Sequence, residues 1–141
     1  MGNSASALKI HFEDMQRAIS KTNIIIISTL DRNKQSCLIE GTLRPEEEES
    51  KINQIIKSPK QAPGIIIYGE NACDDTASKK YLQLIRLGFK DIAIYSGGLF
   101  EWLLLQDIYG DELFPTNGTA DDMLQYKGVS KITKVAPHYQ S

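Results

Sequence analysis

The stretch Ile92-Ala93-Ile94-Tyr95-Ser96-Gly97-Gly98-Leu99-Phe100-Glu101-Trp102 decides the fold of this chain. Its first four residues are apolar, which is typical of a short strand buried on both faces. The glycine pair permits positive φ and close backbone approach, and the apolar run behind it predicts a helix over residues 99–108. A buried strand that passes through a glycine turn into a helix indicates a parallel sheet.

The same alternation of strand and helix continues toward the N-terminus. Ile24–Ile27 and Ile65–Tyr68 predict two further buried strands, and Cys37–Ile39 predicts a short strand or the entry to a turn. Helices are predicted over residues 7–20, from Pro45 to a stop at residues 58–59, and over residues 75–87. We therefore expect the α/β class, with a doubly wound parallel sheet flanked by helices.

Composition excludes several classes of function. The 141 residues fit one domain, and the net charge of −2 gives no basic surface for nucleic acid. Two cysteines without a CxxC pair exclude a disulfide scaffold and a structural zinc site, and we expect neither a metal nor a cofactor. The sequence has no apolar run of about 20 residues and no secretory signal, so we expect a cytoplasmic protein.

The candidate site is the loop behind the Ile65–Tyr68 strand, because ligands of open parallel sheets bind beyond the carboxyl ends of the strands. Backbone amides at a helix start can hold an anion and lower the pKa of a nearby thiol, as a cysteine persulfide or phosphocysteine enzyme requires. The carboxylates of Glu70, Asp74 and Asp75 work against this chemistry, because they repel anions and raise the pKa of the Cys73 thiol. Asp75 and Thr76 are explained as helix caps. The loop contains Gly69, Glu70, Asn71, Ala72, Cys73, Asp74, Asp75 and Thr76.

Taken together, these elements resemble a rhodanese-like domain. The resemblance covers residues 8–115, with residues 1–7 as an acylation segment and residues 116–141 as a C-terminal extension of loop and loose packing. It implies sulfur transfer through a persulfide on a loop cysteine. The first half of the domain, residues 24–30 and 37–43, matches less closely. The matching residues are Ile65-Ile66-Ile67-Tyr68, Leu87-Gly88-Phe89, Ile92-Ala93-Ile94-Tyr95 and Gly97-Gly98-Leu99-Phe100-Glu101-Trp102.

The departures from the family pattern decide the expected function. The family's sulfur-carrying cysteine directly follows the strand tyrosine, where this chain has Gly69. The basic residue common in the loop is missing, and Ile27-Ser28-Thr29-Leu30 does not reproduce the family's Asp-x-Arg at the end of the first strand. We therefore predict a catalytically inactive domain that serves as a binding or regulatory module.

The alternative is an active sulfurtransferase that carries a persulfide on Cys73. This cysteine lies in the same loop, although no histidine stands near it in the sequence, since His11 and His138 are both distant. Cysteine-dependent phosphatase chemistry is less favoured, because the loop has no arginine to hold a phosphate. Cys37 lies in an apolar segment and is interpreted as a core residue.

The N-terminus predicts a lipid. Met1-Gly2-Asn3-Ser4-Ala5-Ser6 places Ser6 where the N-myristoylation motif requires Ser or Thr, so Gly2 is the expected acylation site. One acyl chain gives reversible attachment, which would make the protein a peripheral lipoprotein of a membrane surface. A protein partner is expected at the loop or at the 99–108 helix. That helix is apolar on nearly all sides, so it is either deeply buried or partly exposed as a docking surface.

Overall fold

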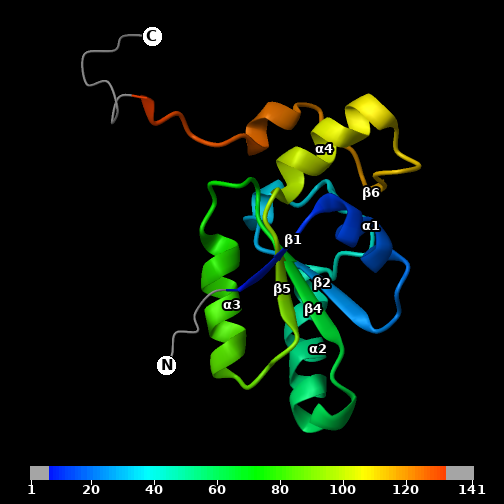
Figure 1. Ribbon diagram of the computed structural model, residues 1–141, viewed down its shortest axis with the longest axis vertical. Coiled ribbons are helices and arrows are strands. Elements are labelled where there is room, and N and C mark those ends of the chain that lie inside the picture. Colours follow the sequence, from blue (N-terminus) through cyan, green and yellow to red (C-terminus); the bar gives the residue numbers. More distant parts are fainter. Residues whose placement is uncertain (1–6, 133–141) are drawn as a thin grey trace.

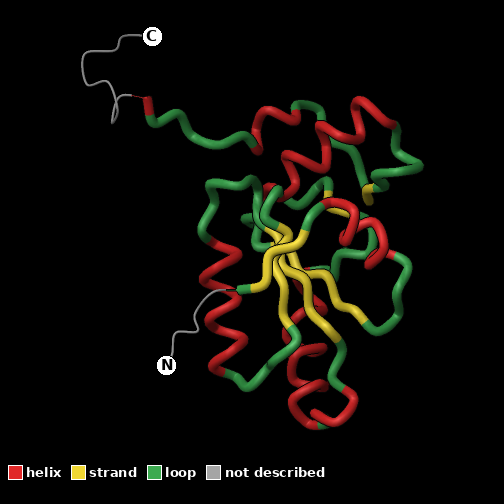
Figure 2. Tube along the Cα trace, in the orientation of Figure 1, coloured by secondary structure: helices red, strands yellow, loops and turns green. Residues whose placement is uncertain are grey.

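The computed structural model of the chain describes residues 7–132. A four-stranded parallel sheet forms its centre, in the order β1-β5-β4-β2 (Figures 1 and 2). Ile66 in the middle of the sheet lies opposite Ile26 on one side and Ala93 on the other. The strands are β1 (Leu8–Ile10), β2 (Ile24–Ser28), β4 (Gly64–Tyr68) and β5 (Ile92–Tyr95).

Helices cover both faces of the sheet, which confirms the predicted fold class (Figure 1). On one face, α2 (Pro45–Lys57) and α3 (Thr76–Arg86) bury isoleucines and other apolar residues against alternate positions of the strands. On the other face, α1 (Phe12–Ile19) and α4 (Gly98–Tyr109) do the same. Strands with both faces covered need apolar residues at every position, as their isoleucine runs supply.

The N-terminal helix is shorter than the sequence predicts. Leu8–Ile10 form β1, which pairs in parallel with Ala93, Ile94 and Tyr95 of β5, and helix begins only at Phe12. The spacing of the apolar residues, taken alone, fits a helix over the whole segment 7–20. The open edge of β5 offers backbone hydrogen bonds to the first residues, and this tertiary pairing outweighs helix periodicity.

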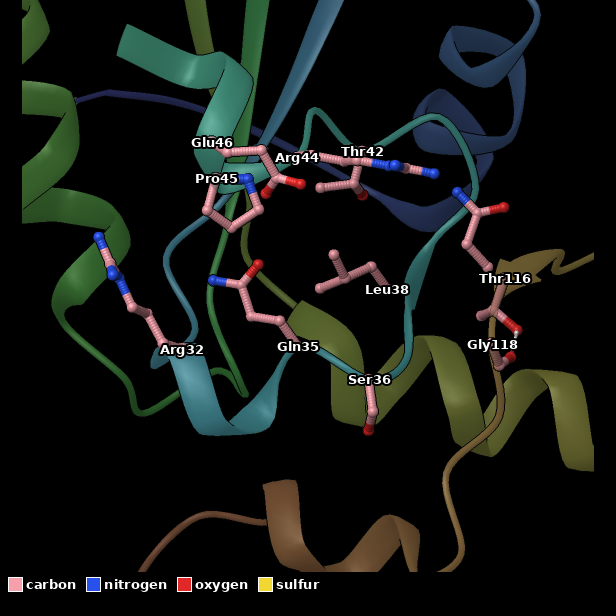
Figure 3. Close-up of a pocket in the computed structure, with 11 residues that line it drawn as sticks. Arg32, Gln35, Ser36, Leu38, Thr42, Arg44, Pro45, Glu46, Thr116 and Gly118 are labelled. Atoms are coloured by element: carbon pink, nitrogen blue, oxygen red, sulfur yellow. Dashed lines mark hydrogen bonds between the residues drawn. The ribbon is translucent and has the colours of Figure 1, made fainter.

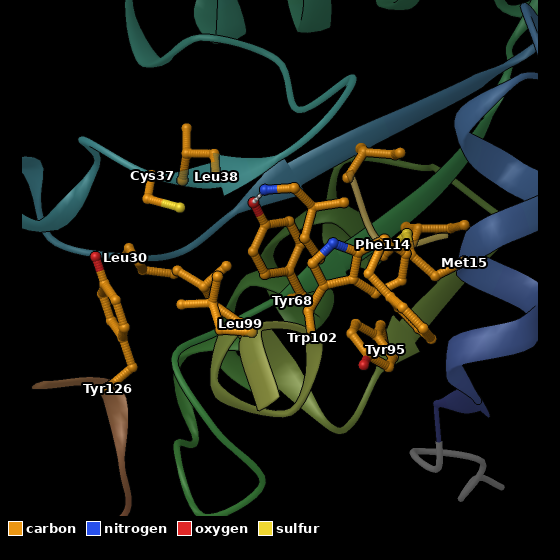
Figure 4. Packing of buried hydrophobic residues seen from close by; sticks show 14 of the residues in the cluster. Met15, Leu30, Cys37, Leu38, Tyr68, Tyr95, Leu99, Trp102, Phe114 and Tyr126 are labelled. Atoms are coloured by element: carbon orange, nitrogen blue, oxygen red, sulfur yellow. Dashed lines mark hydrogen bonds between the residues drawn. The ribbon is translucent and has the colours of Figure 1, made fainter. Parts of the chain in front are cut away.

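The segment behind α4 packs more closely than expected. β6 (Thr116–Asn117) pairs antiparallel with β3 (Leu38–Ile39), and a short 3₁₀ turn η3 (Met123–Tyr126) follows. The side chain of Tyr126 is fully buried in the cluster that contains α1 and α4 (Figure 4). Two other 3₁₀ turns are η1 (Arg32–Lys34) and η2 (Pro59–Gln61).

The apolar residues of α4 are divided between the core and the surface. Leu99 and Trp102 are completely buried, and the indole Nε1 donates to the carbonyl of Pro115 at 3.0 Å. Leu104 and Ile108 remain 39% and 68% exposed. Within residues 7–132, no helix combines the length and the apolar character needed to span a membrane.

Candidate functional site

The loop of residues 69–76 lies where the sequence predicts it, between the carboxyl end of β4 and the start of α3. The N-terminus of α4 contacts it directly. The amide of Leu99 donates to the carbonyl of Gly69 at 3.0 Å, and the amide of Phe100 donates to the carbonyl of Glu70 at 2.8 Å. The first amides of α4 are thus satisfied by the loop itself.

This close approach requires Gly98. Its φ is +71°, and a Cβ at this position would lie 2.7 Å from the amide nitrogen of Asn71 and 2.8 Å from the carbonyl oxygen of Gly69. Gly97 has an ordinary helical φ of −67°. The expected function of the glycine pair, which is close backbone approach next to the loop, is therefore confirmed at Gly98.

The side chain of Asp74 fills the centre of the loop. Its Oδ2 accepts from the amide of Glu70 at 3.0 Å, and its Oδ1 accepts from the amide of Thr76 at 2.9 Å. Burial by itself would raise the pKa of this carboxyl, but the amide hydrogen bonds outweigh burial and hold the pKa below its ordinary value. Two of the amides that could hold an external anion, those of Glu70 and Thr76, are thus occupied by an internal one.

Gly69 shows the consequence for the position where the resemblance implies a catalytic cysteine. A Cβ at Gly69 would lie 2.6 Å from Oδ2 of Asp74 and 3.2 Å from Oγ1 of Thr29. Thr29 is itself held in place, because its hydroxyl lies 2.7 Å from that of Thr76. A side chain at position 69 could not be accommodated without moving the carboxylate.

The cap at the start of α3 differs from the one predicted. Asp75 makes no capping hydrogen bond and instead lies 3.4 Å from Lys79 on the surface. Asp74 accepts from the first amide of the helix. The sequence offers two adjacent aspartates for one function, and the loop conformation selects the first.

Comparison with known proteins supports the fold. No family model matches the sequence, and neither does any curated protein. The solution structure of the rhodanese-like domain of Alr3790 from Anabaena sp. has a TM-score of 0.56 and 22% identity, over 89% of this chain and 94% of that chain. Ygr203w from Saccharomyces cerevisiae, described as a homolog of single-domain rhodanese and the Cdc25 phosphatase catalytic domain, has a TM-score of 0.61. Its identity is 15%, over 86% of this chain and 96% of that chain.

A third structure agrees with these two. The single-domain sulfurtransferase RDL2 from S. cerevisiae has a TM-score of 0.53 and 18% identity, over 81% of this chain and 100% of that chain. The chain has the rhodanese-like fold. At these identities the likeness concerns architecture, so the chemistry of the site is judged from its own residues.

Cys73 lies on the exposed part of the rhodanese-like loop. Its amide donates to Oδ1 of Asn71 at 2.9 Å. Its side chain lies next to Gly128, since a Cβ added to that glycine would be 3.5 Å from the Sγ of Cys73. Among residues 7–132 the only histidine is His11, whose amide donates to Asp14 at the start of α1, and no hydrogen bond joins Cys73 to a base.

Three residues that sequence reasoning singled out lie outside the described range, namely Gly2, Ser6 and His138. Within residues 7–132, no three His, Cys, Asp or Glu side chains are grouped so that they could hold a metal ion together.

A lysine that the sequence analysis missed reaches the loop from η1. Nζ of Lys34 lies 3.1 Å and 3.2 Å from the two carboxylate oxygens of Glu70, in a partly buried pair. Lys34 is far from the loop in sequence, so no local pattern predicts this contact. The charge of Glu70 is therefore compensated, and the repulsion expected from it is weaker than the sequence suggests.

The C-terminal segment forms one wall of the site. Nδ2 of Asn71 donates to the carbonyl of Tyr126 at 2.7 Å, which fixes η3 against the loop. Between them lies a cleft of about 580 Å³ that contains both lysines and carboxylates. Its charged residues are Asp31, Lys34, Glu70, Asp74, Asp75, Lys127 and Lys131. Among the described residues, Asp74 accepts hydrogen bonds from backbone amides and not from any lysine of this cleft.

A larger cleft of about 850 Å³ lies between the 32–46 segment and β6 (Figure 3). Its lining includes the buried residues Leu38 and Thr42. Arg32 and Arg44 supply positive charge, but their side chains point apart (Figure 3). They do not converge on one point, as a bound anion would require.

Proposed function

We propose that this protein is a non-catalytic rhodanese-like binding module, tethered to the cytoplasmic side of a membrane by an acyl chain on Gly2. The carboxylate of Asp74, bonded to the amides of Glu70 and Thr76, is the observation that carries the non-catalytic assignment. It occupies with fixed negative charge the place where sulfur-transfer chemistry needs an anionic substrate.

The chemistry that we propose to be absent is well defined. A sulfurtransferase thiolate attacks the outer sulfur of thiosulfate, forms a sulfur–sulfur bond and releases sulfite, and cyanide then takes up the sulfur as thiocyanate. The attacking sulfur must meet the substrate inside an electropositive cradle. Here position 69 is glycine, and two amides of the cradle, those of Glu70 and Thr76, already donate to Asp74.

The test is thiosulfate:cyanide sulfurtransferase activity of the purified protein, with persulfide trapping by mass spectrometry. We expect no turnover above the buffer rate and no persulfide on either cysteine. Turnover that disappears in Cys73→Ser but persists in Cys37→Ser would overturn the proposal and establish the alternative, a sulfurtransferase that uses Cys73. Cys37 is buried, so its substitution is the matched control for loss of a thiol.

The proposed tether begins with removal of Met1, which frees the α-amine of Gly2. That amine attacks the carbonyl of an acyl thioester, an amide bond forms, and the thiol of the acyl carrier is released. A single acyl chain provides marginal membrane affinity, so attachment would be reversible. Intact mass after coexpression with an N-myristoyltransferase tests the modification, and Gly2→Ala is the control.

The proposed binding surface is the loop together with the exposed end of α4. Leu104 and Ile108 lie on one side of that helix at i and i+4, and both are exposed. If they bind a protein partner, Ile108→Glu abolishes the interaction, whereas a charge at the exposed residue Leu82 of α3 leaves it intact.

A further inference from the structure

The face of the sheet that packs on α1 and α4 is not fully covered. The helix α1 has only 8 residues, and in Figure 2 it lies beside the upper part of the strands. An apolar groove of about 570 Å³ opens next to the lower part, alongside β1. This volume is within the range of roughly 300–1,000 Å³ that is usual for small-molecule sites.

The floor of the groove is a row of apolar side chains across three strands. Leu8 of β1 lies opposite Ala93 of β5, which lies opposite Ile66 of β4. Ile24 contributes further apolar surface on this face, and Tyr81 of α3, which packs with the cluster on the opposite face, also lines the groove. Leu8 is 67% exposed, although it heads the row and neighbours a buried core. Such a surface lacks a covering element.

The rim of the groove is mostly basic. Arg17 and Lys21 border it from α1 and the turn behind that helix, and Lys90 borders it from the segment before β5. Asp14 and Asp91 also lie at the edge. An apolar floor with a charged rim suits a hydrocarbon chain whose attachment point stays in water.

We infer that this groove is the binding site for the acyl chain on Gly2, so that the chain is held by the protein when it is not in a membrane. The inference rests on the acylation proposed above. Leu8 both lines the groove and begins the described sheet, and the backbone from Gly2 to Ala7 can span roughly 17 Å. An acyl group on Gly2 is therefore tethered within reach of the groove.

The competing occupants are less well matched to this surface. A peptide would need unpaired backbone groups, and only the three-residue outer edge of β1 offers them here, because β4 and β5 are paired on both sides over Ile65–Ile67 and Ala93–Ile94. A chain of methylene groups needs only apolar contact. The groove would lower membrane affinity by withdrawing the acyl chain from the bilayer, which makes attachment a two-state equilibrium.

The first test uses isoleucine methyl signals in NMR spectra of the acylated protein without vesicles, compared with Gly2→Ala. We expect the methyl groups of Ile24 and Ile66 to shift on acylation. Those of Ile52 and Ile55, which pack on the opposite face, should not move.

The second test fills the groove. Acylated Ala93→Phe should bind phosphatidylcholine vesicles more strongly than the acylated parent, by about tenfold if about one chain in ten is free in the parent. Leu82→Phe enlarges an exposed side chain outside the groove and should leave vesicle binding unchanged. Thermal melting verifies that both variants fold.

Three outcomes overturn the inference, and they are distinguishable. If intact mass shows no acylation of Gly2, both the tether and the groove assignment fail. If the acylated protein binds vesicles but the signals of Ile24 and Ile66 stay in place, only the groove assignment fails. A folded Ala93→Phe with unchanged vesicle binding likewise leaves the tether and removes the groove.

Discussion

Among single residues, Asp74 makes the central hydrogen bonds of the candidate loop. Its carboxylate accepts two backbone amides within its own loop. We predict that Asp74→Ala lowers the free energy of unfolding by about 2 kcal/mol, because both amides lose a charged acceptor. Asp74→Asn retains one acceptor and should cost about half as much. Urea unfolding at neutral pH measures both, and a loss below about 0.5 kcal/mol for the alanine variant would contradict this account.

The same carboxyl group predicts a pH dependence with a definite sign. Because the pKa of Asp74 is below its ordinary value of 3.8 in the folded protein, the unfolded chain binds the proton first as the pH falls. The contribution to stability is fully present above that value and is lost as the pH falls through the folded-state pKa. The difference in unfolding free energy between the parent and Asp74→Asn should therefore be constant above about pH 5 and shrink below about pH 4.

The measurement is a series of urea unfolding curves for the two proteins from neutral pH into the acid range. Other carboxyl groups are common to both proteins and cancel in the difference. A difference that stays constant throughout the acid range would mean that the Asp74 charge does not stabilise the loop.

Gly98 allows a comparison between steric contact and backbone strain. A Cβ at Gly98 would meet backbone atoms of the loop, whereas Gly88, with φ of +102°, has nothing within 4 Å. We predict that Gly88→Ala costs about 1–2 kcal/mol for the backbone alone, and that Gly98→Ala costs at least about 2 kcal/mol more. Chemical unfolding of both variants tests this. Equal losses would show that the loop moves away from α4 without cost.

At the level of elements, the strands could be predicted because they are buried on both faces. Runs such as Ile24–Ile27 and Ile65–Tyr68 leave no alternative in a chain of this composition. β1 could not be predicted, because Leu8 and Ile10 also fit the apolar face of a helix and only the edge of β5 decides between them. The shorter α1 in turn leaves the groove uncovered.

The position of the candidate loop between β4 and α3 could be predicted from the sequence, but the contacts within it could not. The sequence gives the carboxylates of the loop, yet it does not indicate that Asp74 turns inward to the amide of Glu70. Nor does it indicate that Lys34 and Tyr126 arrive from distant segments. These contacts depend on tertiary packing, which has no local periodicity.

The 3₁₀ turn η3 is anchored by a tyrosine whose hydroxyl is buried without a hydrogen-bond partner among residues 7–132. We predict that Tyr126→Phe stabilises the protein by about 1 kcal/mol, since it removes an unsatisfied polar group. Tyr68 is the matched control, because its equally buried hydroxyl accepts from the amide of Ile39 at 3.1 Å and lies 2.7 Å from Oγ1 of Thr42. Tyr68→Phe should destabilise by about 1–2 kcal/mol.

Thermal or urea unfolding of the two phenylalanine variants gives the comparison. Opposite signs are expected for the same chemical change. If Tyr126→Phe destabilises the protein as much as Tyr68→Phe does, the Tyr126 hydroxyl has a partner that would have to be sought in bound water.

For the whole molecule, the segment behind α4 is part of the core. The rings of Trp102 and Phe114 lie edge to face with centroids 5.0 Å apart (Figure 4). β6 completes the small sheet with β3, and Tyr126 closes the same cluster from the other side. The cluster therefore extends from Tyr68, the residue before the loop, to Tyr126 in the C-terminal segment, so movement of one end affects the other.

This continuity predicts the result of shortening the chain. Truncation after Pro115 removes β6 and Tyr126, which should lower the unfolding free energy by at least about 3 kcal/mol. Truncation after Ile132 leaves every described contact and serves as the control.

Thiol reactivity gives a second, local measurement. Cys73 is exposed, but Cys37 is fully buried, and burial raises the pKa of its thiol.

The control should therefore show one rapidly reacting thiol toward a disulfide reagent, and the chain ending at Pro115 should show two. Removing β6 uncovers Cys37, because its Sγ lies 3.8 Å from the carbonyl of Gly118 in the segment that is lost. A single reactive thiol together with unchanged stability would instead make residues 8–115 a self-sufficient domain. The C-terminal segment would then be an extension that the core does not need.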